Sequence, residues 1–393
     1  MIPNDVLKWT PFQWKQNIRY MKPSGGGAQG VVFVWDQTTT MGNRTNPATS
    51  SFVIKPIQGT GAATKFAEFV LKRAGGASSP NSKPIARNSP VGDALVLKFK
   101  EAERLETDQG IKARWTEVMA HYEGADSFLL QETQQGIQEF GDVSRDGGLR
   151  GMLRNDVLMK NLGMLFAADA IIGNGDRLCQ PNTGNIVFKM DGTLSAIDSS
   201  TVLTNYNAIL NDTSAASHFF AGPADSKPTN WANDLLRGGG LSVPSAKQQQ
   251  AHALGKAPVL PPGFGMKILF DVDTWWTRTF RSHLENGLRV ESQRSGVPMA
   301  VPRPDEWAGA LLAFKAGVDE GIRKADSLLS GFSWLGVKSK YNKYVSTYGG
   351  DPNLDWTNLK IRRVYFKARK KGKSDDEAMA AVTEYVKKKF PGI

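Results

Sequence analysis

Three residues with oxygen-bearing side chains, Asp176, Asn185 and Asp198, lie close together in the sequence. Two alternating apolar runs between the last two are joined by Asp191-Gly192, which is the pattern of a β-hairpin. Asp-Gly favours a two-residue type I′ turn, because both central residues of that turn need a positive φ. Such a turn pairs the residues that lie symmetrically about its centre. Asn185 is therefore expected opposite Asp198, with the two residues about 4.5–5.5 Å apart.

These residue types suit phosphoryl transfer from a magnesium nucleotide. Mg²⁺ prefers oxygen ligands and is held by one or two protein groups together with substrate phosphates. Asn185 and Asp198 would supply two such ligands, and Asp176 would be the catalytic carboxylate that faces the acceptor hydroxyl. An ordinary surface hairpin after a polar turn accounts for the same residues, and this alternative stays open.

A glycine-rich run at residues 24–30 contains Gly26, Gly27 and Gly30. Glycine lets the backbone approach phosphates closely and turn its N–H groups toward them. A strand pattern follows at residues 31–35, so we expect a β-hairpin flap, and neither the dinucleotide-binding fingerprint nor the Walker loop fits. A flexible loop without a ligand is the alternative.

Lys55 stands in an apolar strand pattern at residues 51–57, so its ammonium group must reach an anion or water. The next segment, residues 61–73, predicts a helix that carries Glu68. A strand lysine paired with a helix glutamate holds the α- and β-phosphates in kinase-type sites. Another strand pattern surrounds Lys98, which makes it a rival. Lys55 is preferred because it lies between the glycine-rich loop and the predicted helix.

Residues 128–133 predict a buried strand that ends in a polar stretch. Its last positions include Gln131 and Glu132, which we expect at a hinge between two lobes, where an adenine could lie. Further on, residues 155–172 carry a helical apolar stripe.

Pro304 is expected to open a second long helix. The tail, residues 331–393, is basic, with fourteen Lys and Arg against six Asp and Glu. Within it, the basic region 338–373 is either a solvated face or a docking surface for an acidic partner. A capping-box pattern beginning at Ser374 predicts a final helix.

The composition of the 393-residue chain excludes several classes of protein. Its net charge of +11 suggests an anionic partner, although no nucleic-acid motif accompanies the charge. Cys179 is the only cysteine, and the four histidines lie far apart, so neither a disulfide framework nor a zinc site is expected. No run is long and apolar enough for a transmembrane helix, and the first residues do not look like a signal peptide. These features lead us to expect a cytoplasmic protein.

The order of these motifs resembles the protein-kinase-like superfamily. It is most similar to the atypical branch that contains actin-fragmin kinase and the phosphatidylinositol kinases. The resemblance covers about residues 24–200. It is carried by the Asp-Arg pair that begins at Asp176, the Asn-Ile pair that begins at Asn185 and the Ile-Asp pair that ends at Asp198.

The resemblance implies a bilobal α+β fold with a small β-rich N-lobe and a larger, mainly helical C-lobe. The N-lobe would span residues 1–131, the C-lobe residues 132–330, and a basic helical C-terminal part residues 331–393. The separation of Asp176 and Asn185 in the sequence is longer than in the family, which makes Asn182 a second candidate metal ligand.

By the same resemblance, the chain would be an atypical protein kinase that uses ATP and Mg²⁺ or Mn²⁺. The acceptor would be a protein serine or threonine, with lipids and small molecules left open. One alternative is a catalytically silent module that grips an acidic partner through the basic region 338–373. Its test would neutralise Arg362, Arg363, Lys370 and Lys371. Another alternative is a kinase-fold enzyme that transfers AMP.

Overall fold

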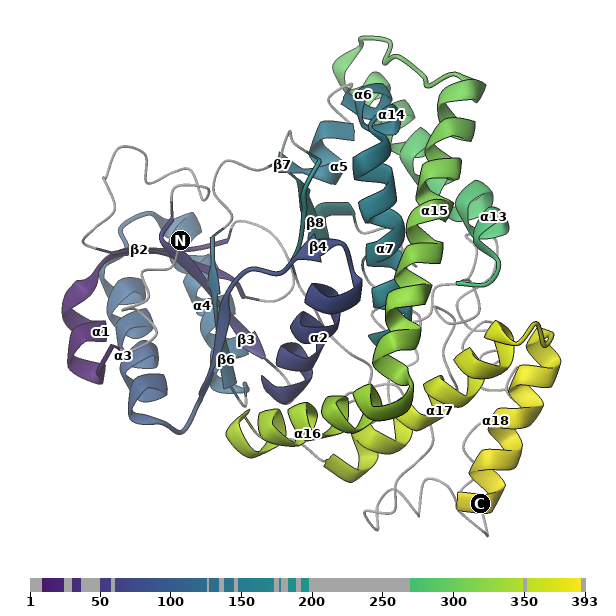
Figure 1. Ribbon diagram of the computed structural model, residues 1–393. Coiled ribbons are helices and arrows are strands. Elements are labelled where there is room, and N and C mark those ends of the chain that lie inside the picture. Colours follow the sequence, from purple (N-terminus) through teal and green to yellow (C-terminus); the bar gives the residue numbers. More distant parts are fainter. Residues whose placement is uncertain are drawn as a thin grey trace. The chain divides into compact units, whose positions relative to one another are not determined.

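The computed structural model shows an α+β chain that forms two compact units (Figure 1). Unit 1 comprises residues 1–65, 80–137 and 343–350, and unit 2 comprises residues 66–79, 138–342 and 351–393. The predicted α+β class is confirmed. The residues that the structure describes are 9–24, 30–36, 50–57, 61–125, 127–133, 138–144, 148–172, 177, 183–188, 192–197, 269–348 and 352–389.

The units differ from the predicted lobes in two segments. The expected boundary at residues 131 and 132 lies close to the division at residue 137. However, residues 66–79, which contain most of the predicted glutamate helix, belong to unit 2. Residues 343–350 of the basic tail belong to unit 1.

Within the described residues, five strands of unit 1 form an antiparallel sheet in the order β1-β2-β3-β6-β5. The strands are β1 (Ile18–Pro23), β2 (Val32–Asp36), β3 (Phe52–Ile57), β5 (Ser82–Ala86) and β6 (Ser127–Glu132). The three predicted strands at residues 31–35, 51–57 and 128–133 are confirmed as β2, β3 and β6.

Helices cover one face of this sheet (Figure 1). They are α1 (Pro11–Asn17), α3 (Pro90–Leu105) and α4 (Gln109–Glu123). Alternate residues of the strands, such as Phe52 and Ile54, pack in one core with Trp14 of α1, Phe99 of α3 and Trp115 of α4. Because side chains alternate along a strand, the residues between them lie on the opposite face of the sheet.

The strand predicted around Lys98 is wrong, because this segment belongs to α3. Its large buried side chains are Leu95, Val96 and Phe99, which is helical spacing, while Leu97 is 55% exposed. Ser89 caps the helix by accepting a hydrogen bond from the N–H of Gly92, and a proline follows the cap. These start signals outweigh the short alternation of apolar residues that suggested a strand.

Unit 2 is mainly helical and contains a small second sheet. Within the described residues its strand order is β4-β9-β8-β7, with β4 (Ala77–Ser78), β7 (Gln138–Glu139), β8 (Ile186–Phe188) and β9 (Leu194–Ala196). The helices up to this sheet are α2 (Gly61–Ala74), which begins in unit 1, α5 (Phe140–Val143), α6 (Leu149–Leu153), α7 (Asp156–Ile172) and η4 (Thr183–Asn185). Those after it are α13 (Val272–Trp275), η5 (Trp276–Arg281), α14 (Ser282–Ser295), α15 (Pro304–Leu329), α16 (Gly331–Tyr348), which ends in unit 1, α17 (Pro352–Lys370) and α18 (Asp375–Lys389).

The helices α7 and α15 run alongside each other at very short distance (Figure 1). Glycines make this approach possible. A Cβ atom added at Gly317 would lie 1.9 Å from the carbonyl oxygen of Lys160, and one added at Gly163 would lie 2.0 Å from that of Phe314. Pro304 opens α15, as predicted, and Trp307 and Phe314 of that helix are buried.

Glu306 joins the start of α15 to α6. Its side chain is 3% exposed, and its carboxylate accepts hydrogen bonds from Nη2 of Arg150 at 3.0 Å and from the N–H of Arg303 at 2.7 Å. Arg154 Nη2 lies 2.5 Å from the same carboxylate. These donors, the Arg150 side chain above all, lower the pKa of Glu306 from 4.5 to about 2.

This shift predicts a specific pH dependence of stability. Because the pKa is lower in the folded state, Glu306 stabilises the fold fully above about pH 4.5, and the contribution is lost as the pH falls toward 2. Glu306→Gln is therefore expected to lose less stability than the wild type over that interval, as measured by urea midpoints. Glu384→Gln, an exposed change on α18, is the control. An equal loss of stability in Glu306→Gln and the wild type as the pH falls from about 4.5 toward 2 would contradict the lowered pKa of Glu306.

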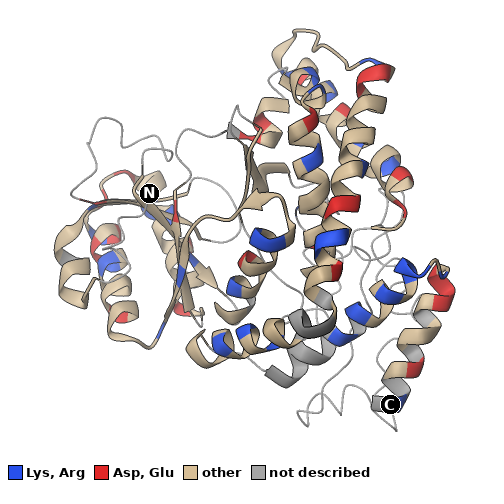
Figure 2. Ribbon diagram, viewed as in Figure 1, with Lys and Arg blue, Asp and Glu red and all other residues tan. Residues whose placement is uncertain are grey.

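Basic side chains occur along α16 and α17, and acidic ones begin α18 (Figure 2). Ser374 and Glu377 form the predicted capping box there, with the N–H of Ser374 donating to Glu377 at 2.7 Å. Within the described ranges, no helix combines the length and the apolar character needed to cross a bilayer.

Candidate functional site

The glycine-rich run joins two antiparallel strands, β1 and β2, so the predicted β-hairpin is confirmed, while its role as a phosphate-covering flap stays a prediction. The N–H of Ser24 donates to the carbonyl of Val31 at 2.8 Å and closes the base of the loop. Gly30 has φ +63°, where a side chain would be strained, and a Cβ atom would lie 3.2 Å from His121. Gly26 and Gly27 lie outside the described residues.

Lys55 lies on β3, on the sheet face opposite the helices, and is 8% exposed. Gln131 of β6 pairs with Val53, and Leu129 pairs with Lys55. Lys55 and Gln131 are therefore diagonal neighbours on one face, about 7–8 Å apart. The structure thus brings together two of the predicted nucleotide-binding residues.

Two other predicted residues are placed differently. Glu132 pairs with Phe52, so it lies on the opposite face from Gln131, and its carboxylate accepts a hydrogen bond from Asn81 at 3.0 Å. Lys98 forms an ion pair with Glu101 at 2.9 Å on α3, which accounts for its charge without a phosphate.

Glu68 lies on the confirmed helix α2, half-buried, in the part that belongs to unit 2. Lys55 belongs to unit 1. The ion pair between Lys55 and Glu68 therefore stays a prediction.

The predicted hairpin is present, but its register is shifted by one residue. Strands β8 and β9 are antiparallel, and Val187 pairs with Ser195, so the pairing is symmetric about residue 191. The N–H of Ile197 donates to the carbonyl of Asn185 at 3.1 Å. Asn185 therefore lies opposite Ile197, and the predicted pairing with Asp198 is wrong. Asp198, Asp176 and Asn182 lie outside the described residues.

The register differs because Asp-Gly fills more than one kind of turn. A two-residue turn would be symmetric about the bond between Asp191 and Gly192. A three-residue loop needs a left-handed residue only at its last position, and Gly192 has φ +83°. The last pair that the structure describes, Phe188 with Leu194, encloses five residues, an odd number that does not agree with a two-residue turn.

Arg177 forms a buried junction next to the hairpin. Its Nη1 donates to Oδ1 of Asp169 on α7 at 2.6 Å, and both side chains are fully buried. Its Nη2 donates to the carbonyl of Ile197 at 3.0 Å. The N–H of Ile197 also donates to the carbonyl of Asn185. Through Ile197, Arg177 therefore links α7 to both strands of the hairpin.

The other end of the hairpin is also attached to α7. The side-chain amide of Asn161 donates to the carbonyl of Gly192 at 3.1 Å. On the outer edge of β9, the hydroxyl of Ser78 on β4 donates to the carbonyl of Leu194 at 3.1 Å. The hairpin is therefore held at both ends by the same helix and along one edge by β4.

The sequence reasoning missed Asp169 and Arg177 as a pair, although a signal was present. Asp169 is the only acidic residue between 157 and 172 in an otherwise apolar helix pattern. A carboxylate on the buried part of a helix requires a cation or several donors. Arg177, eight residues later, was the nearest candidate.

At the hairpin, the protein could supply only a few of the ligands that a Mg²⁺ ion needs. Among the described residues, no group of three or more His, Cys, Asp or Glu side chains is placed to hold a metal. Asn185 lies in η4, half-buried, directly before β8. One amide oxygen and one carboxylate oxygen, completed by phosphate oxygens, remain a chemically suitable set.

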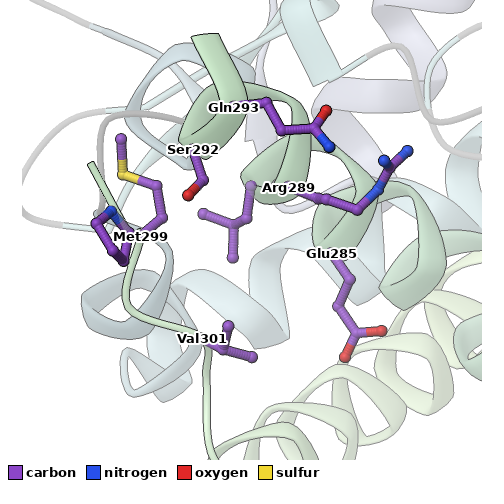
Figure 3. A pocket seen from close by; sticks show the side chains of 8 residues that line it. Glu285, Arg289, Ser292, Gln293, Met299 and Val301 are labelled. Carbon is purple, nitrogen blue, oxygen red and sulfur yellow. The ribbon is translucent and has the colours of Figure 1, made fainter. Parts of the chain in front are cut away.

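A separate surface groove of about 340 Å³ lies between α14 and the segment that follows it (Figure 3). Leu288, Met299 and Val301 contribute apolar surface, and Glu285 and Arg289 contribute charge. None of the predicted site residues lines this groove.

Comparison with known proteins does not assign the chain to a family. No protein-family model matches the chain. A search of curated proteins finds no matching sequence. The resemblance to kinase-like proteins therefore depends on the motif residues alone.

Proposed function

We propose that this protein is an ATP- and Mg²⁺-dependent phosphotransferase with an atypical protein-kinase-like bilobal fold. The γ-phosphoryl group would move to a hydroxyl group, with a protein serine or threonine as the proposed acceptor. The β-rich five-stranded unit and the mainly helical second unit are compatible with such a fold.

One observation carries the proposal. The hydrogen bonds of Ile197 to Asn185 and to Arg177 join the three segments that contain the proposed metal ligands and catalytic carboxylate. Asp176 is covalently adjacent to Arg177, and Asp198 is covalently adjacent to Ile197. This adjacency in the sequence supports the proposal that both carboxylates act near the junction.

Each residue has a distinct proposed role. Asp176 would orient the acceptor hydroxyl and take its proton, and Asn185 and Asp198 would hold Mg²⁺. When bound, Mg²⁺ would neutralise charge on the nucleotide phosphates. Lys55 would contact the α- and β-phosphates, and Glu68 would orient Lys55. The flap closed by Ser24 and Val31 would cover the phosphates with backbone N–H groups.

The two candidate lysines can be separated by matched variants. Lys55→Met keeps the length and the apolar stem of a buried side chain, so the fold is expected to persist. Loss of its charge is expected to lower kcat/KM for ATP about 10–10²-fold. Lys98→Met, which removes a cation paired with Glu101, is expected to leave kcat/KM unchanged. A larger loss in Lys98→Met than in Lys55→Met, measured by steady-state kinetics, would reverse the assignment.

The function itself is tested by labelling. The chain is incubated with Mg²⁺, a cell extract and ATP labelled either in the γ- or in the α-phosphate. Label on a protein from γ-ATP alone is the expected result. Label from α-ATP would indicate AMP transfer, and no label from either would favour a silent binding module.

A further inference from the structure

Arg362 of the basic tail is a buried residue. It lies on α17, is 3% exposed, and its Nη1 donates to the carbonyl of Ala170 at 2.9 Å. One alternative predicted from the sequence places Arg362 in a docking surface for an acidic partner. That role is wrong for Arg362, because a partner cannot reach a buried guanidinium group. Lys370, another of that set, is paired with Asp326.

The contact with Ala170 lies in the last turn of α7. The final carbonyls of a helix have no partner within the helix, and cations there are favourable. Asp169, the neighbouring residue, holds Arg177 at 2.6 Å. Two buried arginines from separate segments therefore bind adjacent residues at the end of one helix.

Helix α17 is itself fixed in unit 2. Tyr365 and Phe366 are fully buried, and the hydroxyl of Tyr365 donates to Asp375 at the start of α18. The guanidinium group of Arg369 lies 5.2 Å from the ring centre of Phe270. Arg362 thus projects from a helix that is anchored independently of its contact with α7.

We infer that Arg362 is a positioning residue, through which α17 fixes the end of α7 and thereby the junction of Arg177 with the hairpin. This inference deepens the proposed function and rests on it. It assigns a structural role at the site to a part of the chain whose charge suggested docking. Arg362 does not touch substrate in this account. It acts through Ala170 and the adjacent Asp169–Arg177 pair.

The test compares Arg362→Met with Arg362→Lys, and uses Lys388→Met, an exposed change on α18, as the control. Hydrogen exchange is followed in peptides from the last turn of α7 and from the middle of α15. We expect faster exchange at the α7 turn in Arg362→Met, partial recovery in Arg362→Lys and wild-type rates in Lys388→Met. Exchange in α15 should stay unchanged.

Kinetics give the second readout. Arg362→Met is expected to lower kcat about 10-fold or more with little change in KM for ATP, because it misplaces reacting groups without touching the nucleotide. Unchanged exchange at the α7 turn in a folded Arg362→Met variant would overturn the inference, as would equal increases in α7 and α15. Should Arg362→Met be unable to fold, Arg362→Lys decides. If Arg362→Lys shows both the wild-type exchange rate at the α7 turn and the wild-type kcat, the inference is overturned.

Failure of the proposed function would look different. A wild-type chain that transfers no phosphate would remove the phosphotransferase, while local exchange at the α7 turn would still decide whether Arg362 supports it.

Discussion

Arg177→Met is expected to lower the free energy of unfolding by about 3–5 kcal/mol. The reason is that Asp169 and Arg177 are both fully buried and 2.6 Å apart, so removing one leaves the other as an uncompensated charge. Urea denaturation at neutral pH measures the change. A loss below about 1 kcal/mol, the range of exposed ion pairs, would contradict a buried pair.

A companion variant separates stability from positioning. Asp169→Leu combined with Arg177→Met removes both charges, and such replacements of buried pairs are often neutral or stabilising. We expect the double variant to regain most of the stability lost in Arg177→Met. Phosphate transfer should not return, because the carbonyl of Ile197 still lacks its donor. Recovery of both properties together would show that Arg177 has no role in positioning the hairpin.

Gly317→Ala is expected to lower the free energy of unfolding by about 3 kcal/mol or more, the upper range for overpacked cores. The added Cβ would lie 1.9 Å from the backbone carbonyl of Lys160. A side chain could rotate away from such a contact, but a helix carbonyl cannot. The two helices must therefore separate, and the packing between α7 and α15 is lost along with the support of the site.

Gly309→Ala provides the matched control on the same helix. No atom lies within 4 Å of a Cβ added at Gly309, so the change acts only through helix propensity. It is expected to stabilise the chain by about 0.5–1 kcal/mol. The two Gly→Ala changes should thus shift the urea midpoint in opposite directions. A shift of the same sign and size would contradict the close helix contact.

Local patterns in the sequence predicted several elements well. The strand around Lys55, the helix that carries Glu68 and the helix opened by Pro304 each have a clear period and clear boundary residues. The strand prediction around Lys98 is wrong because four alternating residues fit a strand as well as a helix, and the helix start signal at Ser89 lies outside that short run.

The geometry of the site was harder to predict, because it depends on contacts between distant segments. The register of the hairpin follows from which residue takes a positive φ, and Asp191-Gly192 allows two answers. The contact of Arg362 with Ala170 joins residues 192 positions apart, which no local pattern encodes. Asp169 is the exception, since an acidic residue in the apolar stripe of a helix predicts a buried cation or hydrogen-bond donor beside it.

The central claim is tested most directly by transfer of labelled γ-phosphate in Asp176→Asn and Asp198→Asn. Asp319→Asn, an exposed change on α15, is the matched control, and urea midpoints verify folding in all three. We predict that both site variants lose Mg²⁺-dependent transfer by about 10²-fold or more while the control keeps it. Wild-type transfer in both folded site variants would contradict the phosphotransferase assignment.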